Sequence, residues 1–262
     1  MRRIIPRLAA LAVVLALGVS ERVVAADLSL GVDPLVIEFT AKPGASARAS
    51  IVVSNAGNQV EHVIAVPIDW RTLFDGNIAV ERAGAEGARS LTSGLTLSDT
   101  DFVLQPRQVR TLTLTLEVPT SKPATPASYW GGFLIEAKPL GAPGDSLGTG
   151  ATVFVYDNVG QPRRHLAMRS LRLTGSGDQT RVEARLRNDG DSYLRIASHL
   201  AIQQAGRVVR EFDIPMNSMF PQAERLLRQP LRGLAPGDYR VELSFDYGGE
   251  TILDGVTQVR IR

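Results

Sequence analysis

Side chains that usually carry catalysis or bind metals are few and widely spaced in this chain. The three histidines, His62, His165 and His199, show no HxxxH spacing, and the sequence contains no cysteine that could complete a zinc site. Zinc needs three or four such ligands, often brought together by local spacing. We therefore expect the histidines to lie at the surface or to be half-buried, with no metal bound.

Two acidic clusters, Asp99-Thr100-Asp101 and Asp189-Gly190-Asp191, resemble fragments of calcium-binding loops. Both lack the ordered oxygen ligands and the distal glutamate that hold calcium, so capping of turns is the expected role. We also expect no serine in a GxSxG nucleophile elbow and no phosphate-binding loop. The sequence thus predicts a protein that is not an enzyme and that binds no cofactor.

Tyr129 and Trp130 form the aromatic pair with the clearest potential for binding. Exposed aromatic side chains anchor peptides or glycans, whereas buried ones fill cores. Both interpretations are kept, and the core interpretation is favoured because aromatic residues dominate cores.

These residues lie in a region with a strong strand pattern. Leu112, Leu114, Leu116 and Val118 alternate with polar residues, which is the two-residue period of a strand with one buried face. Three prolines between residues 119 and 126 end that strand. A second apolar strand is expected over Tyr129–Ala137.

The same period-two pattern, broken by turn residues, continues through the second half of the chain. Tyr239 follows a loop and begins an alternating strand, the arrangement of a tyrosine corner. Asn55-Ala56-Gly57 and Asn188-Asp189-Gly190 both follow a strand, a faint internal echo. The strands expected in the second half include Leu166–Leu173, Arg181–Arg187, Tyr193–Gln203 and Arg207–Ile214.

The fold class that follows is all-β, with two immunoglobulin-like β-sandwich domains after a cleaved signal peptide. The expected boundaries are 27–160 and 161–262, with Asn158–Pro162 as the linker. No long helix is expected outside the signal.

Residues 1–26 have the pattern of a secretory signal peptide. Arg2, Arg3 and Arg7 precede the apolar run Leu8–Val19, and small residues end the segment. The run is too short to span a bilayer, so cleavage is favoured over an uncleaved anchor. We expect a periplasmic location and no membrane insertion after cleavage.

Charge differs between the two halves. Residues 27–162 contain 9 basic and 14 acidic residues, whereas residues 163–262 contain 16 basic and 12 acidic ones. We expect no nucleic-acid partner, because the basic surplus of the whole chain comes from the signal segment. The opposite signs predict two domains that dock with some electrostatic attraction across a modest interface.

With these patterns in hand, the chain resembles the two-domain PapD-like periplasmic pilus chaperones. The resemblance rests on the signal segment, on VIEFTAKPGASARASIVVSNAG and FVLQPRQVRTLTLTLEVP, and on the strand that enters the linker. It implies binding of exported fibre subunits to the last strand of the first domain. The family's Arg and Lys anchors correspond to places near Pro34 and Val153, where this sequence has neither.

Some landmarks look like the wall-associated proteins that interact with WxL surface domains. They are the spacings of PG, VSNAGN, IDWRTLFDGNI, LQP and VPTSKPATPASYWGGFLIE. This resemblance implies a cell-envelope module that recognises peptidoglycan or a surface protein.

The leading functional hypothesis is a non-enzymatic periplasmic chaperone or assembly factor for a pilus- or fimbria-type fibre, binding subunits by β-strand addition. The alternative is the envelope-binding module. The residues expected to contact the partner are Ala151, Val153, Val155, Tyr129 and Trp130.

Overall fold

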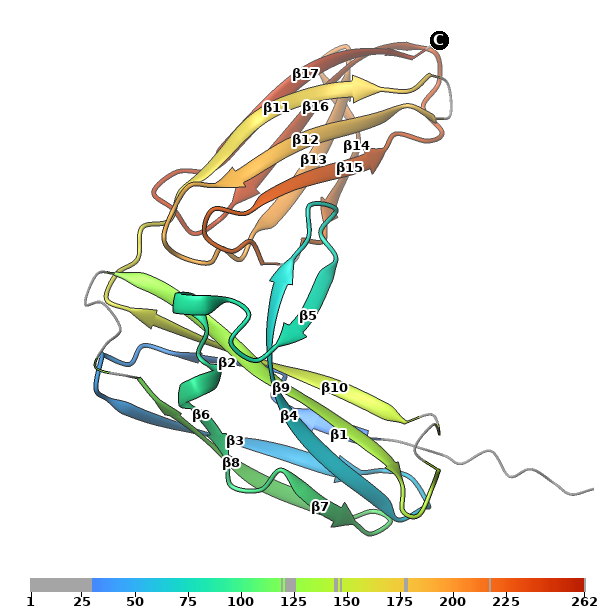
Figure 1. Cartoon of the computed structure of the whole chain (residues 1–262). Coiled ribbons are helices and arrows are strands. Elements are labelled where there is room, and N and C mark those ends of the chain that lie inside the picture. Colours follow the sequence, from blue (N-terminus) through green and yellow to red (C-terminus); the bar gives the residue numbers. More distant parts are fainter. Residues whose placement is uncertain are drawn as a thin grey trace, which may run out of the picture.

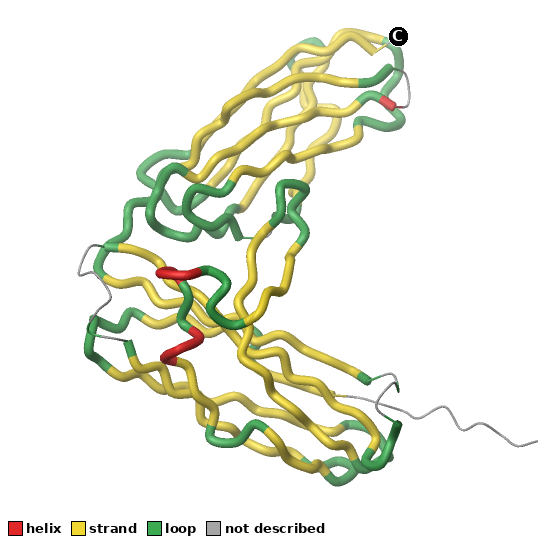
Figure 2. Tube along the Cα trace, in the orientation of Figure 1, coloured by secondary structure: helices red, strands yellow, loops and turns green. Residues whose placement is uncertain are grey.

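The computed structural model describes residues 30–118, 120, 126–143, 146, 148–176, 179–216 and 218–261. Within these ranges the chain consists of strands and loops, apart from short 3-10 turns at Gly87–Arg89 and Thr92–Gly94 and a third around Gln179 (Figure 2). The strands form two sandwiches that follow one another along the chain (Figure 1). The predicted fold class, two all-β sandwiches, is confirmed. The expected signal segment lies outside the described residues.

The first sandwich pairs two sheets. One has the order β1-β3-β8-β6, and the other has the order β2-β10-β9-β4-β5 with β7 paired to β4. The strands are β1 (Leu30–Asp33), β2 (Val36–Phe39), β3 (Ser46–Asn55), β4 (Glu61–Thr72), β5 (Ile78–Arg82), β6 (Leu95–Leu97), β7 (Asp101–Leu104), β8 (Val109–Glu117), β9 (Ala127–Pro139) and β10 (Thr149–Val159).

The alternate leucines of β8 form the centre of the first core, as the sequence predicts. Leu112, Leu114 and Leu116 are fully buried, while the threonines between them face outward. Burial of each leucine is worth about 1.5–3 kcal/mol relative to exposure. These side chains pack against β9 and β10 of the facing sheet, in a core that includes Phe133, Ile135 and Val155.

The second sandwich pairs a three-stranded sheet, in the order β11-β12-β15, with a four-stranded one, in the order β14-β13-β16-β17. Its core includes Leu186, Leu243 and Phe245. The Tyr239 hydroxyl donates to the Ala235 carbonyl over 2.8 Å, which is the predicted tyrosine corner. The strands are β11 (Leu166–Thr174), β12 (Arg181–Asn188), β13 (Ala197–Gln204), β14 (Arg207–Ile214), β15 (Glu224–Pro230), β16 (Gly237–Asp246) and β17 (Leu253–Ile261).

The Asn-x-Gly echo is a shared structural device. In each sandwich a buried asparagine accepts a hydrogen bond from the glycine N–H two residues later, Asn55 from Gly57 and Asn188 from Gly190, both over 2.9 Å. The amide group of each asparagine also donates to two backbone carbonyls, one of them four residues downstream. The same turn therefore closes the same kind of strand in both halves.

No helix among the described residues is long and apolar enough to cross a membrane.

Candidate functional site: the interdomain cleft and the edge of β10

The two sandwiches meet through a cluster of aromatic side chains. Trp130 stacks on Phe220 with ring centres 4.2 Å apart, and Tyr156 stacks on Tyr193 at 4.1 Å. Trp70 contacts Phe220 edge-on at 4.6 Å. All five side chains are buried. Aromatic packing of this kind contributes about 0.5–1.5 kcal/mol per pair beyond the area buried, so the interface has an apolar centre.

Two ion pairs cross the interface around that centre, Glu38 with Arg195 and Arg89 with Asp191. The pair of Glu38 with Arg195 has the polarity expected for an acidic first half and a basic second half, whereas the pair of Arg89 with Asp191 has the reverse polarity. Exposed ion pairs contribute about 0–1 kcal/mol each. The aromatic cluster is therefore the larger contribution to docking.

The β4–β5 hairpin reaches from the first sandwich to the second, as Figure 1 shows. The Leu226 N–H donates to the Phe74 carbonyl over 2.8 Å, and the Thr72 hydroxyl donates to the Ser218 carbonyl over 2.7 Å. A further hydrogen bond joins the two sandwiches, because the Ser128 hydroxyl accepts from the Tyr193 N–H at 3.0 Å. These bonds fix the orientation of the second sandwich relative to β10.

Strand β10 is only partly covered on its outer edge. It pairs with β9 along its full length, but its parallel ladder with β2 spans only Phe154–Asp157. The Phe154 N–H donates to the Leu35 carbonyl over 2.8 Å, on the β2 side. Because backbone groups alternate along a strand, the N–H and C=O of Gly150 and Thr152 point to the same side of β10 as the N–H of Phe154, away from β9. No described strand pairs with them there.

The structure places the residues predicted to bind a partner mostly inside. Val153 and Val155 are fully buried in the first core, and Ala151, on the same face of β10, is half-buried. Tyr129 is buried in that core, and Trp130 lies in the aromatic cluster. The core interpretation of the aromatic pair therefore fits the structure better than the anchor interpretation.

The opposite face of β10 leads into the cleft between the sandwiches. A hollow of about 640 Å³ there is lined by Val36, Phe154 and Tyr156 of the first sandwich and by Arg195 and Met216 of the second. An adjoining hollow of about 430 Å³ shares Met216 and continues over the second sandwich to Pro215 and Ile252. Both linings are rich in apolar side chains, so together they form an apolar groove that begins beside β10.

The polar groups at the cleft are mainly two neutral tyrosine hydroxyls and one ion pair. Burial raises the pKa of the Tyr156 hydroxyl to about 12, and it raises the pKa of Tyr193 further with help from the Glu38 carboxylate. Both hydroxyls are therefore protonated at neutral pH. Arg195, paired with Glu38, is the cation that lines the hollow among the described residues.

Sequence reasoning missed Arg195, Thr152 and Phe154 as parts of this site. Alternation in β10 shows that the strand has two faces, but both faces carry apolar residues, so the pattern cannot tell which one fills the core. Arg195 reaches the cleft from the other sandwich, and no local pattern reports such a placement.

The remaining candidate chemistry is dispersed. No group of three potential metal ligands occurs in the described part of the chain. His62 pairs with Asp101 at 2.6 Å and His199 pairs with Asp213 at 2.9 Å. Asp99 caps a turn by accepting from the Asp101 N–H, and Asp189 binds arginines, so neither cluster forms a calcium loop.

One sequence-based expectation needs correction, because residues 144–148 read GDSLG and match the GxSxG pattern. The setting of this match is not that of a nucleophile elbow. The motif falls between β9 and β10, two antiparallel strands, whereas the elbow joins a strand to a helix.

Comparisons with known proteins concern structure alone. No family model matches the sequence, and no curated protein matches it. The E. coli chaperone DraB is 12% identical with a TM-score of 0.43, and the match covers 90% of this chain and 98% of DraB. The YadV chaperone is 13% identical with a TM-score of 0.47, and the match covers 88% of this chain and 99% of YadV.

A complex of the chaperone CsuC with the tip subunit CsuE, from the archaic chaperone-usher Csu pili of Acinetobacter baumannii, contains a chain that is 11% identical with a TM-score of 0.46. That match covers 89% of this chain and 99% of the other. Chaperones, one of them from Csu pili, are thus among the solved structures that this chain resembles. At these identities the likeness concerns the fold alone.

Proposed function

We propose that this protein is a non-enzymatic, exported chaperone or assembly factor for a pilus- or fimbria-type surface fibre. It would work in the periplasm and hold a fibre subunit by β-strand addition along the first half of β10. One observation carries the proposal: residues 149–153 of β10 have an edge that no described strand pairs with, and the apolar groove begins at the next residue of the strand, Phe154.

An uncovered strand edge can pair with an incoming chain, because its N–H and C=O groups lack partners along the sheet. Gly150 and Thr152 supply these groups here. The side chains of Thr152 and Phe154 lie on the outer face of the sheet, away from Val153 and Val155. Val36 on the neighbouring strand β2 is exposed, as are Ile64 and Val66 on β4, which lies beyond β9 in the same sheet. A subunit with an unfilled apolar face would find both hydrogen bonds and apolar surface at this edge.

Specificity would come from side chains around the edge. The added strand sets its register through the backbone of β10, and the groove selects apolar side chains at alternate positions. Arg195 lines the same groove and offers a cation to a polar group of the subunit. It would do so in exchange for, or together with, its present contact to Glu38.

The uncovered edge can be tested with Thr152→Pro. Proline removes the N–H that points away from β9, so the ladder inside the sheet is kept while one bond to the partner is lost. We expect co-purification of the fibre subunit from periplasmic extracts to fall at least about tenfold, since the ring also blocks close approach. Thr152→Val keeps the N–H and is the matched control that should bind normally.

Subunit recovery by the proline variant equal to that of the valine variant would refute use of this edge. Circular dichroism of both purified variants shows whether the sandwich is intact.

No structural observation favours the alternative, an envelope-binding module that recognises peptidoglycan. That hypothesis relied on exposed aromatic side chains, and Tyr129 and Trp130 are buried. A pull-down on purified peptidoglycan separates the two functions, because the chaperone proposal predicts no retention.

A further inference from the structure

The two sheets of the second sandwich carry charge of opposite sign. Strands β11, β12 and β15 contain seven arginines and two glutamates. Strands β13, β14, β16 and β17 contain four arginines and six carboxylates. The positive surplus of the second half is thus concentrated on one sheet and is not spread over the sandwich.

Most of these arginines lie on the outer face of that sheet. Val182, Ala184 and Leu186 fill the core, so the alternate residues of β12 point outward. Arg172 of β11 and Arg228 of β15 meet the same outer face at Glu183. We call this surface the arginine face. It consists of Arg169, Arg172, Arg181, Arg185, Arg187 and Arg228.

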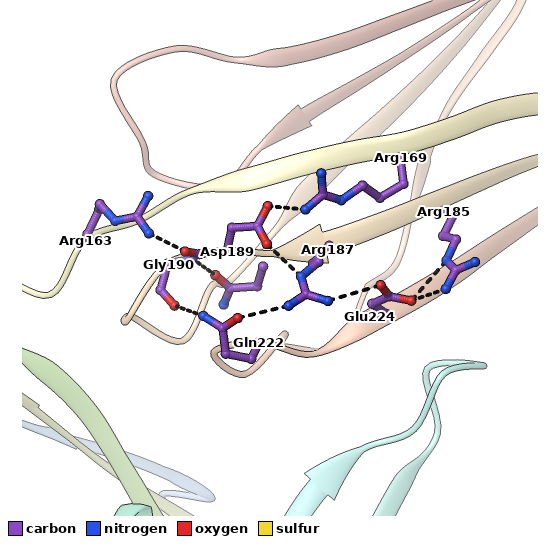
Figure 3. A network of polar contacts seen from close by, with 9 residues as sticks. Arg163, Arg169, Arg185, Arg187, Asp189, Gly190, Gln222 and Glu224 are labelled. Atoms are coloured by element: carbon purple, nitrogen blue, oxygen red, sulfur yellow. Dashed lines mark hydrogen bonds and ion pairs between the residues drawn. The ribbon is translucent and has the colours of Figure 1, made fainter.

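Three carboxylates hold the guanidinium groups in place without neutralising them. Glu183 contacts three arginines at distances of 3.1 to 3.6 Å. Asp189 contacts Arg169 and Arg187, both at 2.7 Å, and Glu224 contacts Arg185 and Arg187 (Figure 3). Each carboxylate serves at least two cations, so the face keeps a net positive charge.

The guanidinium groups nevertheless remain accessible. The side chain of Arg172 is 65% exposed, that of Arg228 is 56% exposed and that of Arg185 is 50% exposed. Guanidinium groups bind phosphate oxygens through paired N–H donors. Ordered, exposed arginines spread over three strands match an array of phosphates better than a single anion.

Apolar side chains border the same face. Leu73 and Phe74, at the tip of the β4–β5 hairpin, are 38% and 46% exposed. The guanidinium carbon of Arg185 lies 5.6 Å from the centre of the Phe74 ring. A bilayer surface offers phosphate groups above an apolar layer, so it satisfies both features. An acidic peptide would satisfy only the charge.

We propose that the arginine face adsorbs to the phosphate headgroups of an anionic phospholipid bilayer, with Leu73 and Phe74 entering the interface at its rim. This contact is peripheral and uses the sheet of the second sandwich that does not line the cleft groove. It is therefore independent of subunit binding at β10.

Vesicle co-sedimentation of the mature protein tests the proposal. Vesicles of phosphatidylcholine with phosphatidylglycerol should retain the protein, and vesicles of phosphatidylcholine alone should not. Because each basic side chain near an anionic surface contributes about 1 kcal/mol, Arg172→Gln with Arg185→Gln should weaken binding roughly 10- to 30-fold. This pair leaves Glu183 and Glu224 with their other arginines.

Arg207→Gln with Arg240→Gln is the matched control, since it removes the same charge from the opposite sheet. It should bind like the unmodified protein. Glu224→Gln should strengthen binding, because it removes a negative charge from the arginine face, and this opposite sign makes the result independent of any loss of folding.

The proposal is overturned if the unmodified protein does not bind the anionic vesicles, or if the two arginine pairs weaken binding equally. It is also overturned if soluble polyglutamate binds while the vesicles do not, a result that would assign the face to an acidic protein partner.

Discussion

The two sandwiches share one construction and differ in what they leave exposed. Both close a strand with the same buried asparagine turn, at Asn55 and at Asn188. The first sandwich leaves half of the β10 edge uncovered and exposes apolar side chains beside it. The second has a face covered with paired arginines. A common scaffold thus supplies stability, while sheet edges and outer faces differentiate the two halves.

A substitution in the aromatic junction between the sandwiches should have the largest effect on stability. Phe220→Ala removes the ring that contacts both Trp70 and Trp130. Loss of a buried phenyl ring costs about 3–5 kcal/mol of unfolding free energy, and we expect the lower end because the junction can partly collapse. Urea unfolding should show this loss, and small-angle scattering should show a larger radius of gyration. An unchanged unfolding midpoint would mean that the aromatic cluster does not join the sandwiches.

The shared asparagine turn gives the next largest effect. Asn55→Ala and Asn188→Ala each leave a glycine N–H and two buried carbonyls without the amide. Each unsatisfied buried group costs about 1–3 kcal/mol before relaxation, so we expect each variant to lose about 2–4 kcal/mol.

Asn58→Ala changes an exposed asparagine near the first turn and serves as the control. Chemical denaturation should give similar losses for the two buried sites. A large loss of unfolding free energy at one turn and none at the other would show that the two Asn-x-Gly turns, although similar in sequence, do not stabilise their sandwiches equally.

Glu183 gives the smallest of these effects and a distinctive pH dependence. Its pKa is lowered, first by the hydrogen bond from Arg181 and then by that from Arg228. A lowered folded-state pKa stabilises the protein above the unfolded-state pKa, near 4.3, and that contribution disappears as the pH falls through the folded-state value. Unfolding free energies of the unmodified protein and Glu183→Gln should therefore differ at pH 7 and converge below about pH 4.

A constant difference between the two proteins from pH 7 to pH 3 would contradict the assigned role of the Glu183 charge. Glu242→Gln, on the opposite sheet, is a suitable comparison.

Much of the fold could be predicted because the local alternation of apolar and polar residues indicates which face of a strand is buried. Leu112, Leu114 and Leu116 alternate with threonines and are buried as expected, and the strand Arg207–Ile214 has the predicted bounds. Strand β15 was not predicted. Leu226 and Leu227 are adjacent, which breaks the period, and Arg225 is buried where an apolar residue is expected.

The candidate site was harder to predict, because its parts come together only in three dimensions. The sequence located β10 but assigned partner contacts to Val153 and Val155, whose side chains fill the core. Phe154 and Tyr156 on the other face are equally apolar, so alternation alone could not choose between the faces. The uncovered edge depends on where β2 ends, and Arg195 depends on the angle between the sandwiches.

Amide hydrogen exchange along β10 tests the central claim most directly. In the isolated protein, the amides of Ala151 and Val153 should be protected by β9, while those of Gly150 and Thr152 should exchange rapidly. In the complex co-purified from periplasm, Gly150 and Thr152 should become protected, because an added strand would cover their N–H groups. Unchanged exchange at both amides in that complex would contradict β-strand addition at β10.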